Sequence, residues 1–224
     1  MPYPFAHPAA VLPFGRYGVP SALVIGSVSP DLWYLVPFLG RSDTHALAGL
    51  VWFCLPVSFA LYILFHFVLK EPLIALISPR LSTFACRGLP ARSWGAVVVS
   101  LLVGIVTHFV WDALTHSNTP GPGVNWVQHA NTVAGTAILA GWIWRKLRLI
   151  PALPPRLSVL ARLGAFAAFA VAGVLWALVS ADISPVFDLA GARLLLRNAG
   201  IAALQGFSLA VLVYCFVFRC KMHL

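Results

Sequence analysis

The sequence predicts an all-α fold: a polytopic membrane helical bundle of about five transmembrane helices, with short N-terminal helices packed or re-entrant at its outer face. Three observations lead to this prediction. Hydrophobic residues make up 60% of the 224 residues, and only 9% are charged, against about 25% in soluble domains. The mean hydropathy is +0.90. Several apolar stretches also reach or approach the roughly 20 residues that a helix needs to cross a bilayer.

The first segment, 1–45, does not read as one long helix. Residues 19–39 are apolar and long enough to span, but Pro30 and Asp31 stand in their middle. A lipid-facing carboxylate beside a helix-breaking proline is costly in a membrane. We therefore expect short, partly re-entrant helices folded against the bundle, with a sixth span over 19–39 as the alternative. Seven prolines favour the short helices: Pro2, Pro4, Pro8, Pro13, Pro20, Pro30 and Pro37.

Five apolar stretches follow as predicted spans: 46–69, 94–115, 127–144, 158–180 and 200–218. The third and fourth are rich in small residues, which suits close helix packing inside a bundle. We expect a single membrane domain over 1–224. Its three parts are the N-terminal segment 1–45 with His7 and Asp31, the metal-site helices 46–145, and the C-terminal helices 146–224.

The basic residues lie mainly in alternate loops, at 70–93, at 145–157 and at the C-terminus. A bias of Lys and Arg toward one side marks the cytoplasmic face of a membrane protein. It predicts a cytoplasmic C-terminus and, with five spans, an N-terminal segment outside. It also explains the net charge of +9 without nucleic acid, so the predicted partners are membrane lipids; the oligomeric state stays open.

A polar stripe at intervals of four ends the second predicted span: Ser100, Gly104, His108, Asp112 and His116. Residues four apart lie on nearly the same face of a helix. Asp112 is one of six acidic residues, and a carboxylate between two imidazoles in an apolar segment is costly unless it binds something. A metal ion is the simplest such partner, since histidines four apart hold zinc on other helices.

Further candidate ligands fall on the same outer face in the predicted topology. Neutral imidazoles and carboxylates suit Zn²⁺, with Mn²⁺ or Fe²⁺ as alternatives, and one or two ions are expected. Asp31 and Asp112 are also predicted as catalytic residues, and Gln128 as a substrate-binding residue. The predicted metal ligands are His7, Asp31, His45, His108, Asp112, His116 and His129.

Structural interpretations of the same residues remain open. His108 and Asp112 could form a hydrogen-bonded pair between helices, and Asp31 could cap a short helix. His7 and His116 could be interfacial residues, and His45 could simply mark a helix start. His129 and Gln128 could be polar contacts within the bundle.

The segments 5–13, 21–31, 44–49, 107–116 and 128–135 together resemble a bacterial membrane family known as domain of unknown function 4184. The resemblance covers about residues 1–145, and 146–224 offers no motif to match. It implies location in the bacterial inner membrane. That family is in turn similar in pattern to inner-membrane metal-dependent hydrolases and, distantly, to zinc-dependent phospholipase C and the P1-type nucleases.

The shared pattern is an early His, a Gly-x-x-x-Pro-Asp segment, a middle His, and His-x-x-x-Asp on a helix. Here these fall on His7, Gly26 with Pro30-Asp31, His45, and His108 with Asp112. The resemblance implies a helical, multinuclear zinc phosphoesterase ancestry. The soluble enzymes also use a further His and a Glu; His116 stands for the first, but no acidic residue lies between Asp112 and Asp182. One or two ions are therefore expected rather than three.

The predicted function is an integral-membrane metal-dependent hydrolase, a phosphoesterase acting on a lipid or lipid-linked headgroup at the outer face of the inner membrane. A non-catalytic membrane protein with a structural metal site is one alternative. A transporter is the other, but it needs polar residues at several depths. Below Gly104 the second span offers only Ser100.

Overall fold

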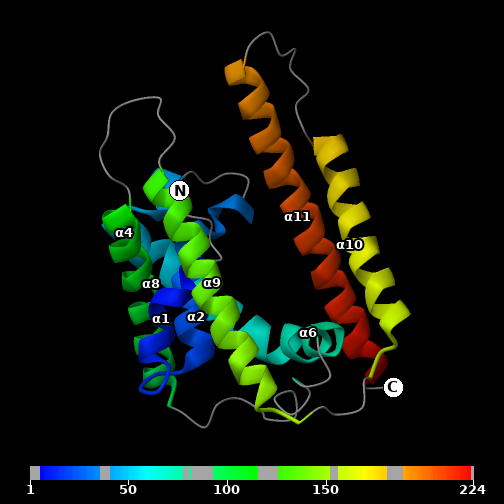
Figure 1. Ribbon diagram of the computed structural model, residues 1–224, viewed down its shortest axis with the longest axis horizontal. Coiled ribbons are helices and arrows are strands. Elements are labelled where there is room, and N and C mark those ends of the chain that lie inside the picture. The colour runs from blue at the N-terminus through cyan, green and yellow to red at the C-terminus, as the bar shows by residue number, and fades with distance from the viewer. Residues whose placement is uncertain are drawn as a thin grey trace. The chain divides into compact units, whose positions relative to one another are not determined.

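The computed structural model describes residues 6–35, 41–77, 81, 93–115, 126–151, 156–180 and 189–222. All regular elements in these ranges are helices, which confirms the predicted all-α class (Figure 1). Within the predicted membrane domain, the chain groups into two compact units. Met1–Phe65 and Arg87–Pro151 form the first unit, and His66–Cys86 and Ala152–Leu224 form the second.

The N-terminal segment of the first unit consists of short helices, as predicted. They are α1 (Pro8–Val11), the 3₁₀ turn η2 (Leu12–Phe14), α2 (Pro20–Val28) and the 3₁₀ turn η3 (Ser29–Leu35). Pro8 and Pro20 each stand at a helix start, where the missing N–H has no intrahelical partner to lose. With nine residues, α2 is too short to cross a bilayer, so the alternative of a spanning helix over 19–39 is wrong for the described residues 19–35.

Helix α2 packs alongside α8 (Trp94–Thr115) in the same direction, and the two helices make many contacts (Figure 1). Three contacts fix the register: Val19 meets Ser100, Leu23 meets Gly104, and Ser27 meets His108. Partner residues differ by 81 at every step, which requires parallel helices in a constant register. The chain therefore reverses direction before α2, and α2 then runs toward the end of α8 that carries His108.

Two other segments complete the first unit. Helix α9 (Trp126–Arg148) packs against the start of the chain through Gly135, where a Cβ would lie 2.9 Å from that of Ala6. The segment before α8 contains α3 (Arg41–Thr44), α4 (Leu47–Gly49), the π turn η4 (Leu50–Cys54) and α5 (Leu55–Leu64). Tyr62 of α5 joins Val19, Ala22, Ile25, Val97 and Leu101 in a buried apolar cluster between α5, α2 and α8.

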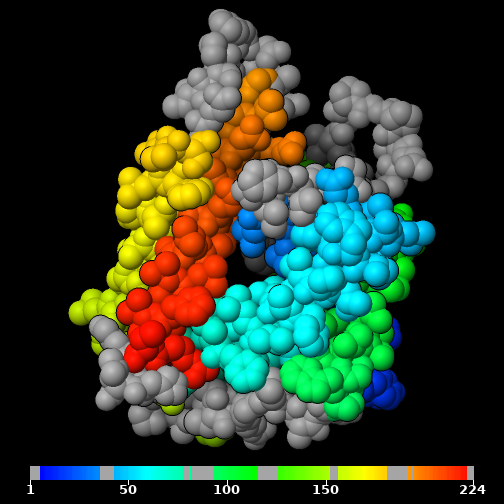
Figure 2. Space-filling model, turned by 180° about the vertical axis from the view of Figure 1, so that it is seen from behind, coloured from blue at the N-terminus to red at the C-terminus, as the bar shows by residue number. Residues whose placement is uncertain are grey.

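The second unit begins within the π turn η5 (Phe65–Leu69) and contains α6 (Lys70–Ile77) and the pair α10 (Val159–Ser180) and α11 (Leu189–Met222). Figure 2 shows α10 and α11 in yellow and orange-red, packed along one another. Gly206 makes the contact close, since a Cβ there would lie 2.4 Å from the Cβ of Trp176. Glu71 of α6 receives Arg156 at 2.5 Å and Arg219 at 3.3 Å, which ties α6 to the end of α11.

Among the described residues, four helical segments are long and apolar enough to cross a membrane. They are Leu47–Ile77, Trp94–Thr115, Val159–Ser180 and Leu194–Cys220. The protein is thus a multi-pass membrane protein, but the expected five spans become four by this criterion. The predicted span 127–144 does form α9, yet Gln128, His129 and Asn131 make its first turns polar. The predicted helix is therefore present at the expected length, but it is less apolar than this criterion requires of a membrane span.

Candidate metal centre

Five predicted site residues converge in the first unit from four parts of the chain. His7 precedes α1, Asp31 lies in η3, His45 lies between α3 and α4, and His108 and Asp112 lie on α8. All five are largely shielded from solvent. The exposed fractions are 1% for His7, 4% for Asp31, 0% for His108 and 6% for Asp112, and 9% for the His45 side chain.

Each of the three imidazoles faces both carboxylates through its Nε2 atom. His7 Nε2 lies 3.7 Å from Asp31 Oδ2 and 3.7 Å from Asp112 Oδ1. His45 Nε2 lies 3.6 Å from Asp31 Oδ1 and 3.6 Å from Asp112 Oδ2. His108 Nε2 lies 3.9 Å and 3.8 Å from the same two oxygens as His45. The donor atoms of the five residues therefore point toward one small volume.

The spacing of these donor atoms fits a coordination shell better than a set of hydrogen bonds. Hydrogen bonds between such groups are about 2.7–3.2 Å long, whereas tetrahedral ligands about 2.1 Å from a zinc ion lie about 3.4 Å from one another. His7, His108 and Asp112 form one group whose ligand atoms all lie within 4.8 Å of each other, and Asp31, His45 and His108 form a second. These buried groups could hold a metal ion.

The tautomer of His108 leaves Nε2 available as a ligand. Its Nδ1 lies 2.8 Å from the backbone carbonyl oxygen of Ser27. A carbonyl only accepts, so Nδ1–H is the donor, and neutral His108 then carries a lone pair on Nε2. That atom lies 3.3 Å from Nε2 of His45. The contact is therefore a hydrogen bond if His45 carries its proton on Nε2, and both Nε2 atoms can bind a cation if His45 carries its proton on Nδ1.

A hydrogen bond at its other ring nitrogen and an aromatic contact orient the His45 ring. Its Nδ1 lies 2.9 Å from the Oγ1 of Thr44, a fully buried residue. The ring of Phe109 stands edge-on to His45 at 5.9 Å, and His7 stacks on His108 with ring centroids 3.9 Å apart. His45 and His108 are thus oriented by hydrogen bonds and ring packing, and His7 by its stacking on His108, as preorganised ligands require.

Two glycines allow α2 to come close enough to orient His108. A Cβ on Gly26 would lie 2.3 Å from the carbonyl oxygen of Leu101, and a Cβ on Gly104 would lie 2.4 Å from that of Leu23. No side chain fits at such distances, so the backbones of α2 and α8 touch directly. This close contact places the Ser27 carbonyl beside the His108 ring.

Of the three other predicted site residues, two fall among the described residues. His116 lies outside the described residues. His129 on α9 is exposed and belongs to neither donor group, and Gln128 beside it is half-buried. Within the polar stripe, Ser100 caps the start of α2, because its Oγ accepts a hydrogen bond from the N–H of Val19 at 2.9 Å.

Two features of the site were not predicted. The Thr44 hydroxyl had a weak sequence signal, a hydroxyl residue directly before a candidate ligand. The Ser27 contribution had none, because it comes from the backbone.

The comparison with protein families gives one finding. The family model described as Domain of unknown function (DUF4184) matches residues 1–216. The match extends through most of 146–224, where the sequence offered no recognisable motif. No curated protein and no solved structure matches the chain, so the expected likeness to zinc-dependent hydrolases stays a prediction. A model matching nearly the whole length identifies the family: the chain belongs to the DUF4184 family.

Proposed function

We propose that this protein is an integral-membrane metal-dependent hydrolase, a phosphoesterase that acts on a lipid or lipid-linked headgroup. The observation that supports it most directly is that three imidazole Nε2 atoms each lie 3.6–3.9 Å from both buried carboxylates. Neutral imidazoles and carboxylates are the donors that Zn²⁺ takes in hydrolytic sites, and Mn²⁺ or Fe²⁺ would suit them as well.

By their nearest carboxylate oxygens, the donor atoms can be assigned to two sets that share both carboxylates, while His108 also lies in one group with His7 and Asp112. The four-donor set consists of Nε2 of His45 and of His108, Asp31 Oδ1 and Asp112 Oδ2. The three-donor set consists of His7 Nε2, Asp31 Oδ2 and Asp112 Oδ1. Each carboxylate thus offers one oxygen to each set, as it would in bridging two ions. This division favours two ions over one.

The two sets suggest different roles. Four protein donors complete a tetrahedral shell, whereas three leave a position for water or substrate. Divalent ions in such a site would lower the pKa of water and balance the charge of a phosphoryl group. His7 then belongs to the set open to substrate. Asp31 and Asp112 are the proposed catalytic residues, because each offers one oxygen to each set and so would set the distance between two bound ions. Gln128 stays the proposed substrate-binding residue.

The position of the site along α8 favours a headgroup as substrate. His108 and Asp112 lie within the last two turns of a candidate span that ends at Thr115, near the depth of a membrane interface. The loop charges favour an outer location in the bacterial inner membrane and a cytoplasmic C-terminus. This orientation requires α9 to cross as well, and its 23 residues reach about 34 Å at 1.5 Å per residue.

One observation also favours a structural metal as the second candidate. The four-donor set alone would form a closed shell, the usual form of a structural site. In that case the metal would clamp η3, the turn at His45 and α8 together without turnover. The two candidates differ in what they predict for Asp31→Asn, which keeps the side-chain size and removes a charged ligand.

The experiment is a lipid-hydrolysis screen with detergent-purified protein reconstituted with Zn²⁺ or Mn²⁺. Phospholipids and other phosphate-ester lipids are incubated, and released headgroup or phosphate is quantified by mass spectrometry. We expect metal-dependent release that falls at least about 100-fold in Asp31→Asn, with a similar unfolding midpoint, and that persists in His129→Ala. If no lipid is hydrolysed and Asp31→Asn only lowers the midpoint, the site is structural and the hydrolase proposal is wrong.

A further inference from the structure

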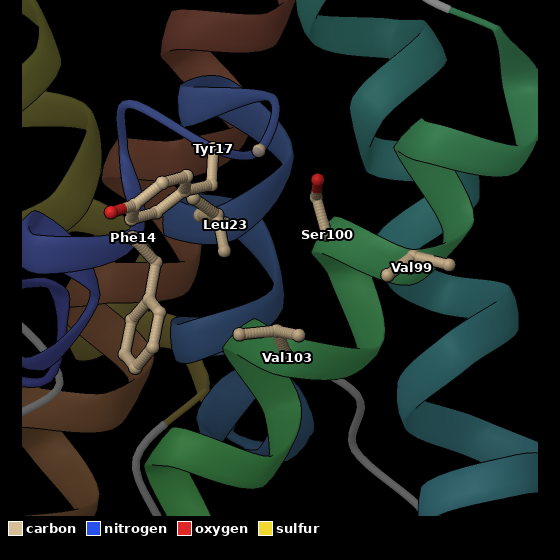
Figure 3. Close-up of a pocket in the computed structure, with 7 residues that line it drawn as sticks. Phe14, Tyr17, Leu23, Val99, Ser100 and Val103 are labelled. Atoms are coloured by element: carbon tan, nitrogen blue, oxygen red, sulfur yellow. The ribbon is translucent and has the colours of Figure 1, made fainter.

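An apolar hollow of about 140 Å³ lies at the beginning of α2, away from the metal centre. Figure 3 shows the rings of Phe14 and Tyr17 on one side of it, with Ser100 and Val103 of α8 opposite. The Ser100 hydroxyl is engaged, since it donates to the Ala96 carbonyl at 2.7 Å and accepts from Val19. The hollow therefore offers an almost wholly apolar surface. Its lining residues are Phe14, Tyr17, Gly18, Leu23, Val99, Ser100 and Val103.

The hollow lies at a depth where lipid chains surround the protein. Ser100 is six residues into the candidate span Trp94–Thr115, about 9 Å from its start at 1.5 Å per residue. Trp94 is 52% exposed there, as tryptophans at membrane interfaces are. Large apolar side chains are exposed beside the hollow, at 43% for Phe14, 67% for Tyr17 and 60% for Val99.

A cation stacks on Tyr17, one of the residues that line this apolar hollow. The guanidinium carbon of Arg16 lies 4.4 Å from the centroid of the Tyr17 ring, and Arg16 is exposed. An arginine beside lipid chains extends toward the interface, where phosphate groups lie. Guanidinium groups bind phosphate in two-pronged geometry. An apolar hollow with an arginine stacked on one of its lining residues matches the two ends of a phospholipid.

We propose that this hollow binds an anionic phospholipid, with its phosphate on Arg16 and one acyl chain between Leu23 and Val103. The lipid belongs to the leaflet on the Trp94 side of the membrane. Its residues are distinct from the five of the metal centre, so binding does not depend on the hydrolase function. The lipid would cover the turn between η2 and α2, where Gly18 approaches Ser100 so closely that a Cβ would lie 2.9 Å from its Oγ.

Native mass spectrometry of the delipidated full-length protein tests this site. The protein is titrated with dioleoyl phosphatidylglycerol and, for comparison, with zwitterionic dioleoyl phosphatidylcholine. We expect one phosphatidylglycerol to bind at least about fivefold more tightly than phosphatidylcholine, because both lipids carry a phosphate but the choline cation of the second offsets its attraction to one arginine. Arg16→Gln should remove this preference and Arg16→Lys should restore part of it. Val103→Trp should fill the hollow and weaken binding of both lipids.

Two matched control variants distinguish binding at this hollow from non-specific binding of lipid elsewhere on the protein. Arg148→Gln removes another exposed arginine stacked on an aromatic ring, that of Trp144 at 3.6 Å. Val106→Trp enlarges a 48% exposed residue on the same helix as Val103. Both should bind lipid as wild type does, and unfolding midpoints check that every variant is folded. Equal binding of the two lipids by the wild type overturns the proposal, as does an equal loss in Arg148→Gln or unchanged binding in Val103→Trp.

Discussion

The backbone and a hydroxyl group orient the two histidines that share a close contact. His108 donates Nδ1–H to the Ser27 carbonyl, and His45 Nδ1 meets the Thr44 hydroxyl, so both direct Nε2 toward the carboxylates. Partners of this kind typically change metal affinity 10–100-fold although they never touch the metal. Metal affinity at the proposed site would therefore depend also on residues that are not ligands themselves.

Replacement of Thr44 tests this dependence. Thr44→Val keeps the buried side-chain shape and removes the hydroxyl, so we expect zinc affinity to fall about 10–100-fold. Thr44→Ser keeps the hydroxyl and should stay within a few-fold of wild type. Zinc affinity is measured by competition with a chromogenic chelator. Wild-type affinity in Thr44→Val would show that the Thr44 contact does not orient a ligand.

The two proposed donor sets predict different metal stoichiometries. His7→Ala removes a donor from the three-donor set alone, so bound zinc should fall from two ions to one per chain. His45→Ala breaks the four-donor set and should lose the ion held there. His129→Ala, an exposed histidine in neither donor group, is the control and should bind as wild type. Two retained ions in His7→Ala would contradict the assignment of the three-donor set.

Among the elements, the parallel pair α2 and α8 determines whether the site can form. Their backbones touch at Gly26 and Gly104, and the same register places Ser27 beside His108. Any side chain at this crossing must separate the helices. Separation would withdraw the carbonyl that holds the His108 ring.

Gly104→Ala tests the close contact. The added Cβ would lie 2.4 Å from the Leu23 carbonyl oxygen and 2.8 Å from the Ser27 backbone nitrogen, so we expect a loss of about 1–3 kcal/mol in stability and weaker zinc binding. Gly95→Ala is the control on the same helix, because its nearest neighbour would be 3.9 Å away. Unfolding midpoints and zinc affinity are both measured. If Gly104→Ala behaves like Gly95→Ala, the crossing does not support the site.

For the whole molecule, the distribution of basic residues predicts the orientation in the membrane. The loop before α8, the segment after α9 and the C-terminus carry most of the Lys and Arg residues, and they share one side only if α9 crosses. Fluorescent-protein and alkaline-phosphatase fusions after residues 120, 150 and 222 measure this. We expect phosphatase activity at the first position and fluorescence at the other two. The same reporter response at 120 and 150 would show that α9 does not cross.

Much of this architecture could be predicted because its causes are local. Prolines and an acidic residue in an apolar segment disfavour one continuous helix there, and the described residues 19–35 form short helices. The interval of four between His108 and Asp112 places both on one helix face. Whether α9 crosses the membrane was harder to predict, because its first turns mix polar and apolar residues. The roles of Ser27 and Gly104 depend on the register of two helices distant in sequence, which no local pattern contains.

The central claim is that the buried histidines and carboxylates bind metal, and metal content tests it most directly. Wild-type protein and the His108→Ala/Asp112→Ala double variant are purified in detergent and analysed by inductively coupled plasma mass spectrometry. We predict stoichiometric zinc or manganese in the wild-type chain, two ions when both donor sets are filled, and loss of these ions in the double variant. Wild-type protein that holds no stoichiometric metal, even after reconstitution, would contradict the account. The five residues would then form a proton-sharing packing cluster.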